Sequence, residues 1–228
     1  MNMSRIFVTG DTHGDIDFHK LSSKNFPIGL TLTKDDYVII CGDFGGLWSG
    51  DNCDNFMLNW YKSKPWTTLF VDGNHENFDL LNTYPIEEWN GGKVHKINDS
   101  IIHLMRGQVF TINGIKFFTM GGAASVDKSC RIEGRSWWKE ELPSRAEYEE
   151  GLDNLEAHNN KVDYIISHSC SNEMLDYLSK DTYVHDDITG FLTIVTNTID
   201  FKIHFFGHYH IDGNFGRYRA LYQDVIEI

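Results

Sequence analysis

The sequence predicts an α/β fold in which two mixed β-sheets pack as a sandwich flanked by helices. Three observations support this prediction. Apolar runs of strand length recur along the chain, helix-like segments separate them, and one stretch near the middle has the pattern of an antiparallel hairpin. The 228 residues suffice for one large domain with a sizeable core, and residues 1–228 are interpreted as a single domain.

Five short apolar runs predict strands that are buried on both faces of a sheet, because their apolar residues are continuous rather than alternating. They lie at residues 5–11, 36–43, 67–75, 162–169 and 202–210. Helices are predicted between them. The clearest is 144–158, where Ser144 and Glu147 have the spacing of a capping box. The other helical segments are 54–62, 171–178 and 189–199.

Residues 100–122 interrupt this alternation, because strand-like sequence lies on both sides of Asn113-Gly114. This dipeptide favours a two-residue hairpin turn. The final stretch, 218–228, is again strand-like and predicts a second antiparallel element. Both sheets are therefore expected to contain parallel and antiparallel strands.

The composition argues against several classes of function. A formal net charge of −13 would repel a long nucleic acid, so such a partner is not expected. The chain has no apolar run of membrane-spanning length, and its first strand begins too early for a signal peptide. We therefore expect a cytoplasmic protein with no membrane partner. The four cysteines have no CxxC spacing, which argues against a structural zinc site or a disulfide framework.

Side chains that bind metals or protons follow all five predicted strands. They are Asp11, His13, Asp43, Asn74, His75, His168, His208 and His210. Carboxyl ends of neighbouring strands in an open α/β sheet face one crevice, so these side chains are expected to converge. His208 and His210 would face the same way if the last strand, ending at Gly207, kept its alternation.

The donor set predicts a metal centre. Two carboxylates, an amide oxygen and several imidazoles suit manganese, iron or zinc, and the set is too large for one ion. Two ions roughly 3.5 Å apart that share one carboxylate would use all the donors and could activate a bridging water for attack at phosphorus.

The ordered motifs D-x-H, GD, GNHE, H and GH-x-H resemble those of the calcineurin-like metallophosphoesterase family, over residues 11–210. The resemblance implies the metallophosphoesterase fold and two divalent ions, with manganese expected and iron, zinc or nickel as alternatives. The first ion would be bound by Asp11, His13 and His210. The second would be bound by Asn74, His168 and His208. Asp43 would bridge both ions, and His75 would serve as general acid or phosphate contact.

The sequence departs from the protein phosphatases that it resembles. They read GDxxDRG at the second motif, whereas Gly46 and Leu47 stand at the later Asp and Arg here. An arginine fork favours a phosphate dianion, so its absence favours a phosphodiester, such as a nucleotide or another small diester, as substrate. A metal-bridging hydroxide would then hydrolyse it. The alternatives are a phosphomonoesterase or protein phosphatase on the same scaffold, and a noncatalytic scaffold.

Substrate contacts are sought in the segment 125–144 and in the hairpin. Arg131, Arg135 and Trp138 could hold a phosphate and stack a base, although an ordinary surface loop with packed tryptophans has the same sequence features. Arg106 is a further candidate phosphate contact, with a solvated hairpin residue as the alternative. A homo-oligomer is left open.

Overall fold

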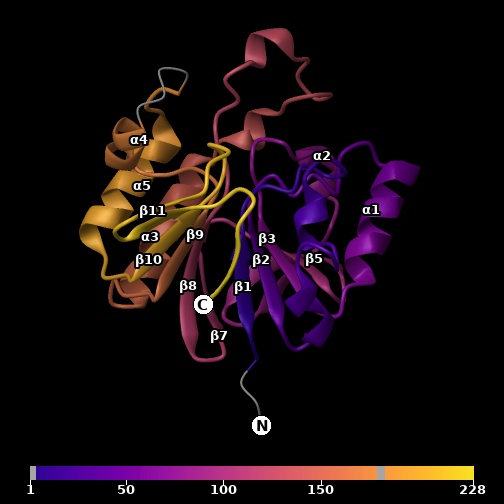
Figure 1. The fold of residues 1–228 in the computed structure, drawn as a ribbon. Coiled ribbons are helices and arrows are strands. Elements are labelled where there is room, and N and C mark those ends of the chain that lie inside the picture. Colours follow the sequence, from indigo (N-terminus) through magenta and orange to yellow (C-terminus); the bar gives the residue numbers. More distant parts are fainter. Residues whose placement is uncertain (1–3, 179–182) are drawn as a thin grey trace.

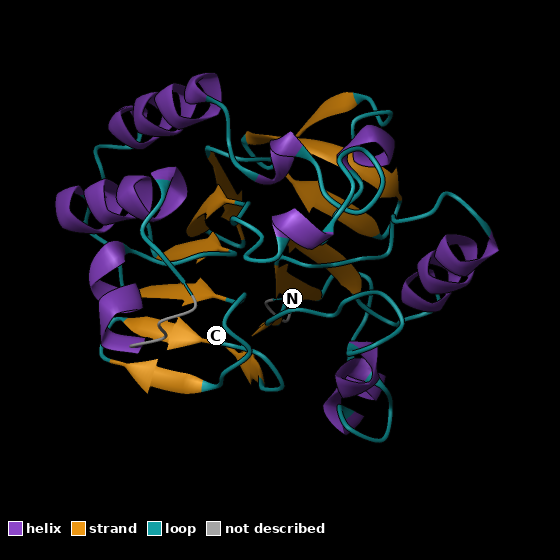
Figure 2. Cartoon of the chain, turned by 90° about the horizontal axis from the view of Figure 1, so that it is seen from above, coloured by secondary structure: helices purple, strands orange, loops and turns teal. Residues whose placement is uncertain are grey.

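The computed structural model describes residues 4–178 and 183–228. Two mixed β-sheets pack face to face, and helices cover their outer faces (Figures 1 and 2). The predicted sandwich is confirmed. In Figure 1 the segment that follows β8 rises above the edge of the sheets at which the parallel strands end.

The first sheet has seven strands in the order β13-β1-β2-β3-β6-β5-β4. They are Ile6–Thr9 (β1), Tyr37–Cys41 (β2), Thr67–Val71 (β3), Ile86–Trp89 (β4), Gly92–Asn98 (β5), Ile101–Leu104 (β6) and Val225–Glu227 (β13). The strands β1, β2, β3 and β6 are parallel, and β13 closes one edge antiparallel to β1, with Val8 opposite Ile226. The predicted C-terminal antiparallel element therefore lies beside the first strand of the chain.

The second sheet has six strands in the order β11-β12-β10-β9-β8-β7. They are Gln108–Ile112 (β7), Ile115–Met120 (β8), Tyr164–Ser167 (β9), Ile203–Phe206 (β10), Gly213–Phe215 (β11) and Tyr218–Ala220 (β12). The predicted hairpin joins β7 and β8, and its turn residues Asn113 and Gly114 have φ angles of 54° and 79°. Positive φ at both positions matches the twist of antiparallel strands, which explains the Asn-Gly pair.

Within the described residues the fold also has five α-helices: Asn52–Lys62 (α1), Phe78–Leu81 (α2), Arg145–Ala157 (α3), Asn172–Leu178 (α4) and Asp187–Thr198 (α5). The capping box of α3 is confirmed, because Ser144 and Glu147 bond reciprocally at its start. Helix α5 begins two residues before the predicted segment, because Asp186 and Thr189 form a second capping box there.

Three apolar layers hold these elements together. Between the sheets, side chains such as Val8, Ile39 and Leu69 pack against Phe117, Ile166 and Phe205. Alternate residues of the first sheet pack toward α1, and those of the second pack toward α3 and α5. The parallel strands are thus buried on both faces, which accounts for their continuous apolar sequences.

Strands β4 and β5 were not predicted. The sequence of β4 is polar because it lies at the sheet edge, where its residues alternate between exposed and half-buried positions. Strand β5 lies between β6 and β4, and most of its residues are only half-buried. No helix within residues 4–178 and 183–228 is long and apolar enough to cross a membrane.

Candidate metal centre

The eight metal- or proton-binding side chains predicted from the strand ends lie close together in the structure. Five strands supply them: β1, β2, β3, β9 and β10 each end within a few residues of one or more of these side chains. The strands come from both sheets. The site therefore lies where the carboxyl edges of the two sheets meet, above the interface between them (Figure 1).

The backbone of this site is unusual. His13, Asp43, His208 and His210 have φ angles of 42°, 48°, 67° and 51°. Few residues other than glycine adopt this left-handed region, and several together commonly mark a functional site. Strand β10 ends at Phe206, so His208 and His210 lie in a strained loop. The expectation that strand alternation aligns these two rings is therefore wrong.

Two glycines of the motifs allow this close packing. A Cβ atom at Gly73 would collide with the Asp43 carboxylate, and one at Gly207 would collide with the Asp11 carboxylate. The glycines that precede Asn74 and His208 thus let a neighbouring chain segment approach each carboxylate.

The Asp11 carboxylate is fully buried. Its Oδ2 lies 3.2 Å from Nε2 of His210, and its Oδ1 lies 3.6 Å from Nδ1 of His168. The backbone N–H of His208 donates to it at 3.1 Å. Burial alone would raise the pKa of Asp11, but the neighbouring His168 and His210 lower it below its ordinary value.

The Asp43 carboxylate is buried between two imidazoles. Its Oδ2 lies 3.1 Å from Nε2 of His13, and its Oδ1 lies 3.3 Å from Nε2 of His168 and accepts the backbone N–H of His75 at 2.8 Å. Burial would raise the pKa of Asp43, but His168 and His13 hold it well below its usual range. Within the described chain, no lysine or arginine side chain pairs with Asp11 or Asp43.

His168 and His208 lie side by side, with ring centres 4.9 Å apart, but their pKa values are shifted in opposite directions. Burial would lower the pKa of His168, yet Asp43 and Asp11 raise it to about 9. Burial and the neighbouring His168 lower the pKa of His208 to about 3. The buried carboxylates therefore favour the charged form of His168, whereas burial and the neighbouring His168 disfavour the charged form of His208.

These donors fit divalent cations. Ligand atoms of Asp11, His13 and His210 lie within 4.8 Å of one another, the set predicted for the first ion, and those of His13, Asp43 and His75 form a second such group. Two buried carboxylates neutralised only by imidazoles and N–H groups suit a hard-to-borderline cation. The donors predicted for the second ion are brought together differently, with Nε2 of His168 3.2 Å from Oδ1 of Asn74.

The orientation of Asn74 depends on residues that the sequence interpretation missed. The Asn74 amide donates to Oγ of Ser125 at 3.2 Å, and that hydroxyl donates to Glu141 at 2.7 Å. Glu141 is fully buried and also pairs with Lys128. Because the NH2 group is held by Ser125, the carbonyl oxygen of Asn74 faces the site. The signal for this chain, a buried Glu beside polar residues, is weak in sequence.

The His75 ring lies across from His13, with ring centres 5.4 Å apart. The guanidinium of Arg131 lies against it, with nitrogens 3.3 Å from Nε2 and 3.5 Å from Nδ1. Burial lowers the pKa of His75, Asp43 opposes this shift, and Arg131 adds to it. Arg131 is thus the predicted substrate contact that the structure brings to the site.

A second missed residue, Glu76, anchors the loop that carries Asp43. It is buried and accepts the backbone N–H groups of Phe44 and Gly45 at 2.7 and 3.3 Å. Burial and the nearby Asp43 raise the pKa of Glu76 well above its ordinary value. The last residue of the GNHE motif therefore shapes the second motif, which lies on another strand.

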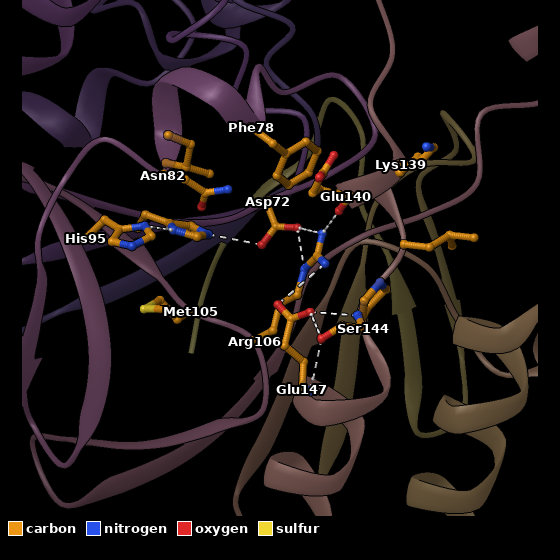
Figure 3. A pocket seen from close by; sticks show the side chains of 14 residues that line it. Asp72, Phe78, Asn82, His95, Met105, Arg106, Lys139, Glu140, Ser144 and Glu147 are labelled. Atoms are coloured by element: carbon orange, nitrogen blue, oxygen red, sulfur yellow. Dashed lines mark hydrogen bonds and ion pairs between the residues drawn. The ribbon is translucent and has the colours of Figure 1, made fainter. Parts of the chain in front are cut away.

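Arg106 does not reach the eight-residue cluster, so its prediction as a phosphate contact is corrected. It is buried, its Nε and one terminal nitrogen donate to Asp72 at 2.8 and 2.5 Å, and that nitrogen also donates to the Glu140 carbonyl. Figure 3 shows this arrangement beside a separate cavity of about 560 Å³. The other side of Asp72 contacts His103 at 3.0 Å.

Two other predicted substrate contacts differ in position. Trp138 is buried in the core, where its indole donates to Asp79 at 2.8 Å and packs edge-on against Trp48. The prediction that Trp138 stacks a base is therefore corrected, because only 3% of the residue is exposed. Arg135 is exposed on the same segment.

Comparison with known proteins agrees with this geometry. The model of the family described as calcineurin-like phosphoesterase matches residues 4–212, which include all eight site residues and most of the chain. The search of curated proteins found no match.

Proposed function

The chain belongs to the calcineurin-like phosphoesterase family, a family of metal-dependent phosphoesterases, and we propose that it hydrolyses a phosphodiester, either a nucleotide or another small diester. The observation that carries this proposal is the pair of buried carboxylates, Asp11 and Asp43, which share imidazole neighbours but form no ion pair with a lysine or arginine among the described residues. Such a site is electrostatically completed by cations.

We propose two divalent ions, with manganese as the metal that best suits the donors. The first would be held by Asp11, His13 and His210. The second would be held by Asn74, His168 and His208, and Asp43 would contact both. When bound, the ions would supply positive charge to the phosphoryl oxygens and lower the pKa of a water molecule.

The protein's own residues would orient and protonate the substrate. His75 lies beside the proposed ions without being needed by either, so its ring is free to hydrogen-bond the departing oxygen. No carboxylate pairs with this ring within the described chain; its neighbours are Arg131 and His13. Arg131 adds one guanidinium that can bond a non-bridging phosphoryl oxygen.

Preference for a diester rests on the second motif. Gly46 and Leu47 stand where protein phosphatases of the family place an Asp and a phosphate-clamping Arg, and Leu47 is buried in the core. A single guanidinium, that of Arg131, suits the single negative charge of a diester better than the dianion of a monoester.

A phosphomonoesterase is the second candidate. It would require the Arg131 guanidinium, which lies beside His75, to replace the missing Arg of the second motif from a different segment of the chain.

The two candidates are separated by their rates on matched esters. Metal-free protein supplied with Mn²⁺ should hydrolyse bis(p-nitrophenyl) phosphate with a kcat/KM at least equal to that for p-nitrophenyl phosphate. A strong preference for the monoester would establish the second candidate. Absence of turnover on either ester with any of the four metals would leave only the noncatalytic scaffold.

The role of His75 is tested with the His75→Ala variant. We expect it to retain both metal ions and to lose activity by about 10²–10⁴-fold on an ester with an alkyl or nucleoside leaving group. The loss on a p-nitrophenyl ester should be smaller, because that leaving group hardly needs a proton. Equal losses on both esters would assign His75 to the phosphoryl oxygens instead, and loss of metal would make it a ligand.

A further inference from the structure

A cavity of about 900 Å³ opens directly beside the candidate metal centre. Three of the eight site residues, His13, His75 and His210, form part of its wall. The rest of the wall comes from the loops after β1 and β2, from helix α1 and from Tyr222 near the C-terminus. A phosphoryl group at the centre would therefore have this cavity next to it.

Apolar side chains form much of the cavity wall. They are Ile16, Trp48, Phe56, Met57 and Tyr222. Ile16 and Phe56 are 71% and 62% exposed, which is unusual for large apolar residues that face one hollow together. Such a grouping on a protein surface commonly marks a binding site.

Two aromatic rings connect this wall to the metal centre. The Trp48 ring lies 6.3 Å from the His75 ring, centre to centre. Tyr222 stacks on His210 at 4.6 Å, and its hydroxyl donates to Asp17 at 3.1 Å. Asp17 in turn contacts Nδ1 of His13 at 2.7 Å. The apolar wall is therefore held in a fixed position relative to the metal-binding side chains.

The charges of the wall restrict what can bind there. The residues that line the cavity include Asp15, Asp17 and Asp54, and no lysine or arginine is among them. The Asp54 carboxylate accepts the backbone N–H groups of Trp48 and Gly50 at 2.7 and 2.8 Å. Away from the metal centre, a second phosphate or a carboxylate would meet the like charge of these aspartates and no lysine or arginine of the cavity wall.

We propose that this cavity binds an uncharged, apolar or aromatic ester group of the substrate, with Ile16, Trp48 and Phe56 as specificity-determining residues. The proposal rests on the phosphoesterase function proposed above and narrows it. Phosphoesters whose organic group carries further phosphates are disfavoured, and those with an aromatic group are favoured.

Simple phosphonates test this inference, because they carry one organic group and are not hydrolysed. With Mn²⁺ present, methyl-, phenyl- and 1-naphthylphosphonate are compared as competitive inhibitors of bis(p-nitrophenyl) phosphate hydrolysis. Burial of an aromatic ring should lower the inhibition constant roughly tenfold or more from methyl to naphthyl. An equal inhibition constant for all three would overturn the proposal.

Variants of exposed residues locate the effect. Phe56→Ala and Ile16→Ala should weaken inhibition by 1-naphthylphosphonate several-fold and leave inhibition by methylphosphonate unchanged. The matched control is Ile194→Ala, an exposed isoleucine on α5 at the other side of the molecule (Figures 1 and 2). A control variant that weakens naphthyl binding as much as Phe56→Ala would overturn the assignment.

Cys53 provides a readout that does not depend on turnover. It is an exposed cysteine in the cavity wall, and the other exposed cysteine, Cys130, can be removed as Cys130→Ser. In that background, 1-naphthylphosphonate with Mn²⁺ should slow the reaction of Cys53 with a maleimide, whereas methylphosphonate should not. Equal labelling rates with both phosphonates would contradict binding in the cavity.

The outcomes separate this inference from the proposed function. Metal-dependent hydrolysis with equal inhibition by all three phosphonates would retain the function and overturn the cavity assignment. No hydrolysis and no metal binding would overturn the function itself. Competition by a phosphopeptide but not by 1-naphthylphosphonate would mean that the cavity accepts a protein segment, which also overturns the proposal.

Discussion

Two buried clusters of this molecule contain the same residue types but are built for different purposes. One is the candidate metal centre around Asp11 and Asp43. The other lies around Asp72, which contacts His103 at 3.0 Å, and His103 in turn contacts His95 at 3.2 Å (Figure 3). Both combine buried carboxylate with histidine, but the metal centre draws its residues from the ends of strands in both sheets, whereas His95 and His103 lie within β5 and β6 of the first sheet.

The two clusters differ in that, among the described residues, only the one around Asp72 has a guanidinium paired with its carboxylate, that of Arg106. Burial would raise the pKa of Asp72, but Arg106 and His103 lower it below its ordinary value. Arg106 therefore neutralises Asp72 completely within the protein. Asp11 and Asp43 have no such partner in the described chain, and four residues around them have left-handed backbone. The comparison teaches that a buried carboxylate–histidine cluster stays open to an added cation where the protein supplies no guanidinium to pair with its carboxylates.

The largest expected effect comes from removing a negative charge at the candidate metal centre. Asp43→Asn should lower metal occupancy at both proposed positions and nearly abolish hydrolysis, because in the proposed centre this one carboxylate would contact both ions. Metal analysis of the purified variant and its turnover are the measurements, with Asp35→Asn, an exposed aspartate, as control. Two ions per chain with normal turnover would remove Asp43 from the bridging role.

The same change in the cluster around Asp72 should lower the stability of the fold instead. Asp72→Asn leaves the buried Arg106 guanidinium without its carboxylate and should lower the free energy of unfolding by about 3–5 kcal/mol. Urea unfolding measures this loss. The double variant Asp72→Asn with Arg106→Met should recover part of the stability, because the uncompensated charge is gone. A single variant as stable as the wild type would show that the ion pair is not needed.

A smaller effect concerns how the free energy of unfolding depends on pH through His95, in the cluster around Asp72. Burial and the neighbouring His103 lower the pKa of His95 to about 4, below its ordinary value near 6.5. As the pH falls below about 6.5, the unfolded chain binds a proton that the folded chain refuses. The stability contribution present above this pH is thus lost progressively toward pH 4.

His95→Gln should remove this proton linkage. Between pH 7 and pH 5 the variant should lose about 1–2 kcal/mol less unfolding free energy than the wild-type chain. The measurement is urea unfolding at both pH values, with His19→Gln, an exposed histidine, as control. If His95→Gln and the wild type lose the same unfolding free energy between pH 7 and pH 5, the pKa of His95 is not lowered by folding.

Sequence patterns predicted the five parallel strands well, because a strand buried on both faces needs apolar residues at nearly every position. Every one of the five apolar runs contains a strand, and the Asn113-Gly114 turn and the α3 capping box are where the residues indicated. Strand β4 escaped prediction because an edge strand needs no apolar face. Strand β5, between β6 and β4, escaped because its sequence GKVHKIN contains only two apolar side chains, Val94 and Ile97.

The sequence by itself determined the donors of the candidate metal centre. Asp11 and Asp43 follow neighbouring parallel strands of the first sheet, so they must lie at one edge of that sheet. His168 follows β9 of the second sheet and joins them because the carboxyl edges of the two sheets meet. The residues that complete the site could not be found in this way. Asn74 is oriented by Ser125, 51 residues later, and His75 is covered by Arg131, 56 residues later.

Tertiary structure alone decided which charged residues serve the site and which serve the fold. Arg106 and Arg131 look alike as candidate phosphate contacts, yet Arg106 is claimed by Asp72, which lies 34 residues earlier. The apolar cavity is a similar case. Ile16 lies in the loop after β1 and Phe56 lies in helix α1, so the two side chains line one cavity only after folding. Whether a side chain binds a ligand depends on the partners left to it, and those partners are brought by contacts between segments far apart in the chain.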